Sequence, residues 1–317
     1  MRFFLLLAFL GLGIGVFLAV KKSVPLYQLP EQESALLALG KSHFRKGNFE
    51  ESLLAFQKAL DKNPQSVSAL MQLANFYRYV GGQYDKAETM FQKALEINPE
   101  NNWILVDLGK LYRNMGRYQD AEDMFFKVLA RSPDTVAAYD YGLGYLYLEQ
   151  DQYERAEAMF KKALELSPER DFAYMGLGDL YREMGRYQES ETMFRRALAL
   201  NPKSEAYLGL GWLYLYQKEH GKSEEAFLSY LDVLKPKSEV YYGLGGIYLF
   251  QQRYEQAEDM FQKSVDLNPR LGGYIGLGSL YEKLKQYDKA REMFAKELQL
   301  NPQNQSAKNQ IEYLDSL

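Results

Sequence analysis

The sequence predicts an all-α fold in which eight helix-turn-helix repeats stack in chain order to form a solenoid. Three observations support this prediction. Between residues 33 and 302 the sequence repeats itself every 33 to 35 residues, small and aromatic residues recur at fixed places in each period, and a proline ends each period. The 317 residues are 47% hydrophobic and 25% charged, which supplies enough apolar surface for a folded core.

Residues 1–22 are expected to form an N-terminal hydrophobic helix that anchors the protein in a membrane. Residues 3–20 carry no charge or strongly polar group, and they are flanked by Arg2 on one side and by Lys21 and Lys22 on the other. A helix of these 18 residues is about 27 Å long, close to the roughly 30 Å of a hydrocarbon core. The flanking basic residues nearly balance, so the sequence favours an extracytoplasmic repeat domain only slightly.

The alternative for this segment is a secretory signal that is removed after export. Such signals end in small residues around the cleavage site, but here Phe17 lies two residues before Ala19. We therefore expect an uncleaved single-pass anchor, followed by a short extended linker over residues 23–32 that contains Pro25 and Pro30.

The first helix of each repeat carries a small residue after a leucine and an aromatic residue, or a histidine, three positions later. The small residues are Gly40, Ala74, Gly109, Gly144, Gly178, Gly211, Gly245 and Gly278. The rings are those of His43, Tyr77, Tyr112, Tyr147, Tyr181, Tyr214, Tyr248 and Tyr281. Residues at these spacings lie on one side of a helix, so small residues allow close approach of the helix axes and rings fill the remaining space.

The second helix of each repeat carries a small residue that is followed four positions later by phenylalanine. The phenylalanines are Phe56, Phe91, Phe125, Phe160, Phe194, Phe227, Phe261 and Phe294. Glycines such as Gly47, Gly116 and Gly185 are expected to end the first helices in the left-handed conformation. Proline ends the second helix because it cannot continue the hydrogen-bond ladder.

Two parts of the array depart from this pattern. In the sixth repeat His220 replaces a tyrosine and Tyr230 replaces an alanine, so we expect its second helix to be displaced. Residues 303–317 follow the last repeat and are expected to form a C-terminal capping helix, with Ala307 and Leu314 on its apolar side.

This pattern resembles the tetratricopeptide repeat over residues 33–302, and bacterial membrane-anchored proteins of that family in particular. The resemblance implies a right-handed superhelix of helix pairs with a concave face lined mainly by first helices. It also implies a non-enzymatic scaffold that binds a segment of a partner protein, with a role in assembling an envelope complex. A secreted adaptor or chaperone for an exported protein is the alternative if the N-terminal segment is cleaved.

Composition argues against several other functions. The net charge is −4, so no overall basic field attracts nucleic acid. There is no cysteine, and the two histidines, His43 and His220, both occupy aromatic positions of the repeat. Paired glycines such as Gly142 and Gly144 recur inside helices, which indicates packing and not a dinucleotide site. We expect no catalytic, cofactor-binding or metal-binding residues, and nothing in the sequence indicates a homo-oligomer.

The partner-binding residues are expected at the inner positions of the first helices. Carrying the family's inner positions over one by one gives Lys41, Arg45, Asn75, Arg78, Lys110, Arg113, Tyr141, Tyr145, Arg182, Leu208, Trp212, Tyr242 and Phe250. The basic half should steer and orient a partner through exposed charges, whereas the aromatic half should supply affinity. The competing interpretation is that a solvated charged face and packing between repeats explain both halves.

The clamp by which some family members hold the C-terminal carboxylate of chaperones is incomplete. Lys41 and Asn75 stand at compatible positions, but Leu37, Met71 and Asp107 replace other members of the clamp. A chaperone tail is therefore not the expected partner.

Overall fold

The computed structural model describes residues 32–80 and 82–316, and over these residues the chain forms 17 α-helices and one π-helical segment, η2. The predicted anchor over residues 1–22 and all but the last residue of the predicted linker over 23–32 lie outside the described residues. None of the helices in the described part of the chain is long and apolar enough to cross a membrane.

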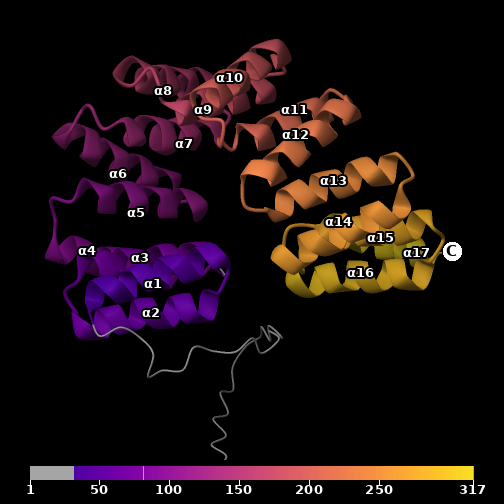
Figure 1. Ribbon diagram of the computed structural model, residues 1–317, viewed down its shortest axis with the longest axis horizontal. Helices are drawn as coiled ribbons and strands as arrows, with labels where there is room; N and C mark the ends of the chain where they lie inside the picture. The colour runs from indigo at the N-terminus through magenta and orange to yellow at the C-terminus, as the bar shows by residue number, and fades with distance from the viewer. Residues whose placement is uncertain (1–31, 81, 317) are drawn as a thin grey trace, which may run out of the picture. The chain divides into compact units, whose positions relative to one another are not determined.

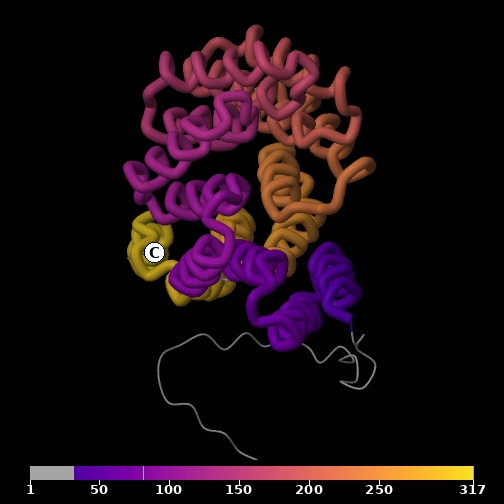
Figure 2. The backbone as a smooth tube through the Cα atoms, turned by 90° about the vertical axis from the view of Figure 1, so that its left-hand side faces the viewer, coloured from indigo at the N-terminus to yellow at the C-terminus, as the bar shows by residue number. Residues whose placement is uncertain are grey.

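The helices alternate as the repeat pattern predicts, and within each of the two units defined below consecutive helices lie next to one another in chain order (Figures 1 and 2). The first helices are α1 (Glu33–Lys46), α3 (Val67–Tyr79), α5 (Asn102–Asn114), η2 (Ala138–Gly144) continued by α7 (Tyr145–Leu148), α9 (Asp171–Glu183), α11 (Ala206–Tyr216), α13 (Ser238–Phe250) and α15 (Gly273–Lys283). The second helices are α2 (Phe49–Lys62), α4 (Tyr84–Ile97), α6 (Tyr118–Arg131), α8 (Tyr153–Leu166), α10 (Tyr187–Leu200), α12 (His220–Val233), α14 (Tyr254–Leu267) and α16 (Tyr287–Leu300). This order confirms an all-α solenoid of eight helix pairs from residue 33 onward.

The helices form two compact units. Unit 1 ends at Leu111 and unit 2 begins at Tyr112, within α5. Each unit is described by itself below.

A phenylalanine on the second helix packs between glycines of two successive first helices, and this contact explains the paired glycines. A Cβ atom on Gly144 would lie only 2.5 Å from Cε1 of Phe160, and one on Gly176 of the next repeat only 2.1 Å from the same atom. Gly245 and Gly276 enclose the Phe261 ring in the same way. Glycine is required at these positions because any side chain would occupy the space of a fully packed ring.

Two kinds of side-chain hydrogen bond recur between the helices. The hydroxyls of Ser190 and Ser223 donate to the carbonyls of Gly178 and Gly211, in each case over 2.7 Å. Serine can therefore replace alanine at this position without leaving a buried hydroxyl unpaired. Tyrosines of the first helices also donate to glutamates on the second helix of the preceding repeat. These bonds join Tyr147 to Glu122, Tyr181 to Glu157, Tyr214 to Glu191 and Tyr281 to Glu258. The aromatic positions therefore bond neighbouring repeats as well as filling space.

The turns inside the repeats require a residue in the left-handed conformation. Gly116 and Gly185 both have φ of 71°, as expected for helix-ending glycines. At the equivalent turns of four other repeats this conformation is adopted by residues other than glycine: Asp151, Lys218, Gln252 and Lys285. The turn geometry is therefore retained where its preferred residue is absent.

The fourth repeat absorbs an extra residue in η2. Pro133 and Gly144 are eleven positions apart, whereas Pro99 and Gly109 in the preceding repeat are ten apart. A π-helical turn accommodates one residue more than an α-helical turn, so the glycine still reaches its phenylalanine. Asp140 is fully buried in this segment, where its carboxylate accepts a hydrogen bond from Arg170 Nε over 2.6 Å.

The expected displacement of the second helix in the sixth repeat is wrong. Helix α12 has 14 residues, as its counterparts do, and Phe227 packs against Gly211 and Gly243 in the usual way. Tyr230 is buried where other repeats carry a smaller residue, and it joins a core cluster with Val240. The array ends in α17 (Gln305–Asp315), which buries Ala307 and Leu314 against Phe294.

Candidate functional site

Five of the thirteen predicted inner residues line one pocket in unit 1. The pocket has a volume of about 440 Å³ and lies among the first helices α1, α3 and α5 and the second helix α2. Its lining residues are Lys41, Phe44, Arg45, Phe56, Gln72, Asn75, Phe76, Arg78, Tyr79, Asp107 and Lys110. The predicted basic residues from Lys41 to Lys110 therefore form a single concave site.

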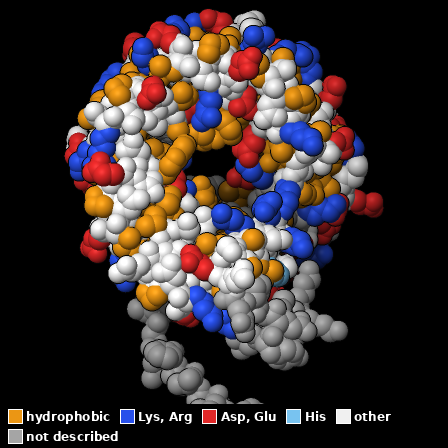
Figure 3. Space-filling view, turned by 60° about the vertical axis from the view of Figure 1, so that its left-hand side comes forward, with side chains coloured by type: hydrophobic (Ala, Val, Ile, Leu, Met, Phe, Trp, Pro, Cys, Tyr) orange, Lys and Arg blue, Asp and Glu red, His pale blue; other side chains and the backbone are white. Residues whose placement is uncertain are grey.

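The charge of this pocket is unbalanced. It contains four basic side chains and one carboxylate, that of Asp107, which leaves three positive charges in excess. Asp107 already accepts hydrogen bonds from Asn75 Nδ2 over 3.2 Å and from Lys110 Nζ over 3.4 Å. Acidic and basic side chains are interspersed on the molecular face in Figure 3, and the whole chain carries −4, so this excess is a local property.

Arg78 is the most unusual of the four cations because it is only 5% exposed. Its Nη1 donates to the backbone carbonyl of Asp107 over 3.3 Å, and its Nη2 donates to the Tyr79 hydroxyl over 2.7 Å. Its guanidinium also lies 4.5 Å from the Tyr79 ring centroid. Among the residues that the structure describes, no carboxylate pairs with Arg78, and its buried Nε has no hydrogen-bond partner.

Aromatic rings form the apolar part of the pocket. Phe44 and Phe76 pack edge to face with their centroids 6.1 Å apart, and Phe56 is buried beneath them. Tyr79 is 64% exposed at the C-terminal end of α3. The pocket thus combines basic groups with a rigid apolar wall, a combination typical of protein interfaces.

Phe44, Phe76 and Tyr79 are site residues that the sequence analysis did not predict. Tyr79 directly follows Arg78, and Phe44 is four positions after Gly40, which is the same place in the repeat that Arg78 occupies. Helical spacing from the small residue could therefore have identified Phe44. Nothing in the repeat pattern marks the burial of Arg78, because the other repeats place phenylalanine, arginine, leucine or glutamate there, and all of these are partly exposed.

In unit 2 the predicted basic and tyrosine positions bind one another across successive repeats. Arg113 Nη1 donates to the carbonyl of Tyr141 over 2.7 Å, and the Tyr145 hydroxyl donates to Asp179 over 3.2 Å. Arg182 Nη1 lies 2.8 Å from the same Asp179 carboxylate. The contacts of Arg113 and Tyr145 join successive repeats, as the competing interpretation expected, whereas the pair of Arg182 and Asp179 lies within α9.

Burial is the main cause of the pKa shifts of Tyr145 and Asp179 in this network. Desolvation raises the pKa of the Asp179 carboxyl above its ordinary value, and Arg182 opposes the shift. Desolvation and the neighbouring Asp179 raise the pKa of Tyr145 well above 10. Both tyrosine and aspartate are held by partners within the chain, so neither is a free recognition group.

The remaining predicted residues fall into two kinds. Leu208, Trp212 and Tyr242 are partly buried against one core cluster, and the Trp212 ring meets Phe227 edge to face at 5.4 Å. Phe250 is 69% exposed at the C-terminal end of α13 and stacks on His220 with centroids 4.2 Å apart. Of these four residues only Phe250 presents most of its ring to solvent.

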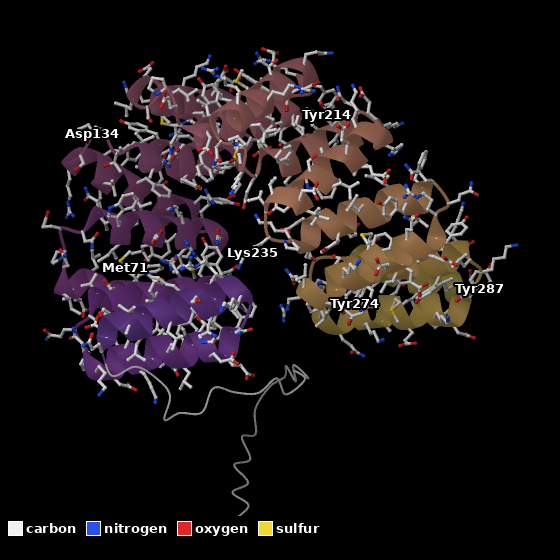
Figure 4. All side chains as sticks on the ribbon, in the orientation of Figure 1. Met71, Asp134, Tyr214, Lys235, Tyr274 and Tyr287 are labelled. Atoms are coloured by element: carbon white, nitrogen blue, oxygen red, sulfur yellow. The ribbon has the colours of Figure 1, made fainter. Side chains whose placement is uncertain are left out.

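A second pocket, in unit 2, is lined by the turn before α16 and by residues of α16 and α17. It is formed around Lys285, Tyr287 (labelled in Figure 4) and Arg291. Here Arg291 is paired with the carboxylates of Asp288 and Asp315 at 3.1 and 2.8 Å. The lining of this pocket also has more basic than acidic side chains, but its arginine is paired with two carboxylates. The pocket in unit 1 is the stronger candidate because its buried Arg78 has no carboxylate partner among the described residues.

The chain belongs to the tetratricopeptide repeat family. Family models described as tetratricopeptide repeat match residues 37–102, 81–143, 135–203, 175–239, 238–271 and 272–304, which together cover the array without a gap. Proteins built from these repeats are typically non-enzymatic scaffolds, and their grooves typically bind protein segments. No curated protein matches the chain.

Solved structures share the fold at low sequence identity. A tetratricopeptide repeat protein from Parabacteroides merdae ATCC 43184 is 24% identical with a TM-score of 0.55, over 74% of this chain and 93% of that one. Yeast Tom70 is 18% identical with a TM-score of 0.70, over 93% of this chain and 66% of that one. Cut9–Hcn1 of the APC/C hetero-tetramer is 16% identical with a TM-score of 0.63, over 91% of this chain and 57% of that one.

Proposed function

We propose that this protein is a membrane-tethered scaffold that binds a segment of a partner protein along the inner face of its repeats. In this proposal the eight repeats wind into a right-handed superhelix, and the inner face is its concave side. The observation that carries the proposal is the convergence of Lys41, Arg45, Asn75, Arg78 and Lys110, from three successive first helices, on one pocket. A role in assembling an envelope complex follows only from the resemblance to anchored members of the family.

Exposed aromatic side chains at the ends of first helices support the proposal that the partner binds to the inner face. Tyr79, Tyr216 and Phe250 end α3, α11 and α13 and are 64%, 60% and 69% exposed. Large rings that a folded chain leaves in water are the side chains that most often supply interface energy. All three stand five residues after the small residue of their repeat, as the predicted inner residue Arg45 does, and this equivalence supports their assignment to the inner face.

Affinity capture of the native partner from the source cells tests this proposal. Tyr216→Ala with Phe250→Ala removes two exposed rings from first helices and should reduce capture strongly, with about 2 kcal/mol lost for each true hot spot. The matched control, Phe126→Ala with Leu228→Ala, removes exposed apolar groups from second helices and should leave capture unchanged. Equal capture by both double variants would move the interface away from the first helices.

The tether is supported by the apolar residues 3–20 and is tested separately. Full-length protein should stay with membranes after alkaline carbonate washing, and deletion of residues 1–22 should release it. N-terminal sequencing distinguishes the tethered scaffold from the secreted adaptor. A mature chain that begins after residue 19 would show that the N-terminal segment is a cleaved signal and not an anchor.

A further inference from the structure

We propose that the pocket in unit 1 binds the side-chain carboxylate of an acidic residue within an extended partner segment. This inference rests on the proposed function and adds the chemistry of the partner. The occupant is an internal acidic segment of a polypeptide, not a free C-terminus, a phosphorylated residue or a nucleic acid.

The charges of the pocket indicate that its ligand is negatively charged. Lys41 and Arg45 are exposed on α1, and neither forms an ion pair with any residue that the structure describes. Arg45 Nε donates only to the backbone carbonyl of Lys41, over 3.3 Å. The one carboxylate of the pocket, Asp107, is engaged by Asn75 and Lys110. The charges of Lys41, Arg45 and Arg78 thus lie at a concave site whose one carboxylate is engaged by other residues.

Arg78 supplies the main driving force. A guanidinium that is nine-tenths or more buried has lost most of its hydration, and here no carboxylate of the described chain replaces it. A carboxylate that enters the pocket would lie beside this guanidinium as its counter-ion, and hydrogen bonds to charged groups are about twice as strong as neutral ones. Binding would therefore satisfy a group that folding leaves unsatisfied.

Asn75 indicates that the carboxylate arrives on a peptide. Its Nδ2 donates to Asp107, which fixes the orientation of the amide, and its buried Oδ1 has no partner. Because this oxygen has almost no accessible surface, its pairing requires the Asn75 side chain to turn toward the pocket that it lines. The donor would then be a backbone N–H next to the acidic residue, which a carboxylate or phosphate alone does not supply.

The size and walls of the pocket fit a few side chains of a segment. A volume of about 440 Å³ lies in the range of pockets that enclose small ligands. The Phe44 and Phe76 rings offer an apolar wall, and the exposed face of Tyr79 continues it toward solvent. An acidic residue with apolar neighbours would use both parts of the pocket.

Selection from random peptides displayed on phage tests this inference without knowledge of the partner. The peptides are fused at their C-termini to the coat protein, so only side-chain carboxylates are available. With the full-length protein as bait, we expect enrichment of aspartate or glutamate at one position, flanked by apolar residues. Lys41→Ala with Arg45→Ala should abolish this enrichment, and the control Lys263→Ala with Lys296→Ala, which removes the same charge elsewhere, should retain it.

The selected peptide, synthesised with blocked termini, gives the quantitative test by fluorescence anisotropy. Replacing its acidic residue by the amide should weaken binding about tenfold or more, as expected for a lost bond to a charged group. Arg78→Met should cause a similar loss while leaving the unfolding free energy of the unliganded protein unchanged or raised, because it removes a buried charge that has no carboxylate partner.

Four results would overturn the inference: no acidic enrichment, equal binding of acid and amide peptides, binding that requires a free C-terminal carboxylate, or binding that requires a phosphorylated residue. These failures are distinguishable from failure of the proposed function. If Lys41→Ala with Arg45→Ala still captures the native partner and Tyr216→Ala with Phe250→Ala does not, the scaffold function stands and the acidic partner is wrong.

Discussion

Two adjacent glycines of α13 provide a matched test of how the repeats pack. A Cβ atom on Gly245 would lie 2.6 Å from two ring atoms of Phe261, whereas a Cβ atom on Gly246 would meet nothing within 4 Å. The Phe261 ring cannot retreat, because Gly276 of the next repeat lies against it, with its own Cβ position only 2.3 Å away. Gly245→Ala therefore overpacks the core, while Gly246→Ala adds a methyl group to open space.

The difference in unfolding free energy between the two variants can be estimated because both substitutions raise the helix propensity by the same amount. That gain is about 0.8 to 1 kcal/mol for alanine over glycine in a helix interior. Gly246→Ala should therefore stabilise the protein by close to this amount. Gly245→Ala carries an additional overpacking cost of about 1 to 3 kcal/mol, which is the expected difference between the two variants.

Hydrogen exchange followed residue by residue measures this difference better than a single unfolding transition, since repeat arrays do not always unfold in two states. Amides of α13, α14 and α15 should exchange faster in Gly245→Ala than in wild type, and slower in Gly246→Ala. Equal protection in the two variants would refute the claim that the glycines are required by the phenylalanine ring.

Three further predictions concern the array. Gly144→Leu should overpack Phe160 and accelerate exchange most strongly near residues 102–202, whereas uniform acceleration along all eight repeats would contradict nearest-neighbour stability. Burial, together with hydrogen bonding to Glu258, raises the pKa of Tyr281 from 10.0 to about 12, so its contribution to stability is fully present below pH 10 and is lost as pH rises from 10 to 12. Alkaline unfolding should show this loss in wild type and less of it in Tyr281→Phe, and identical pH profiles would contradict it. Lys285→Gly should stabilise the last repeat by up to about 1 kcal/mol in thermal unfolding because it relieves a φ of 59°, and destabilisation would show that the turn is unstrained.

The fold was predictable because each repeat specifies its own helices and its contacts to the next repeat. The phenylalanine after the second small residue and the terminal proline each occur eight times in the sequence, and the paired glycines occur five times, because each has a local cause that recurs. Two features escaped this argument. The π-helical η2 depends on one extra residue before Gly144, and the register of α12 depends on whether Tyr230 can be buried, which its neighbours in space decide.

The candidate site was predictable in position but less so in energetics. Lys41, Asn75 and Lys110, which the sequence analysis assigned to inner positions of the first helices, line one pocket. We expected the basic residues to act through exposed, screened charges, but Arg78 is buried without a carboxylate partner in the described chain. Burial depends on how α3 packs against α5, and residue spacing within one repeat does not contain that information.

Site-specific photo-crosslinking to the native partner is the most direct test of the claim that the first helices bind a protein segment. A photoreactive amino acid is placed at Tyr79, Tyr216 or Phe250 on first helices, and at Phe126 or Leu228 on second helices as controls with exposed side chains. We predict adducts with one partner protein from the first-helix positions only, mapped to a continuous segment that contains an acidic residue. Adducts that form only from Phe126 or Leu228 would place the interface on the second helices and contradict the account.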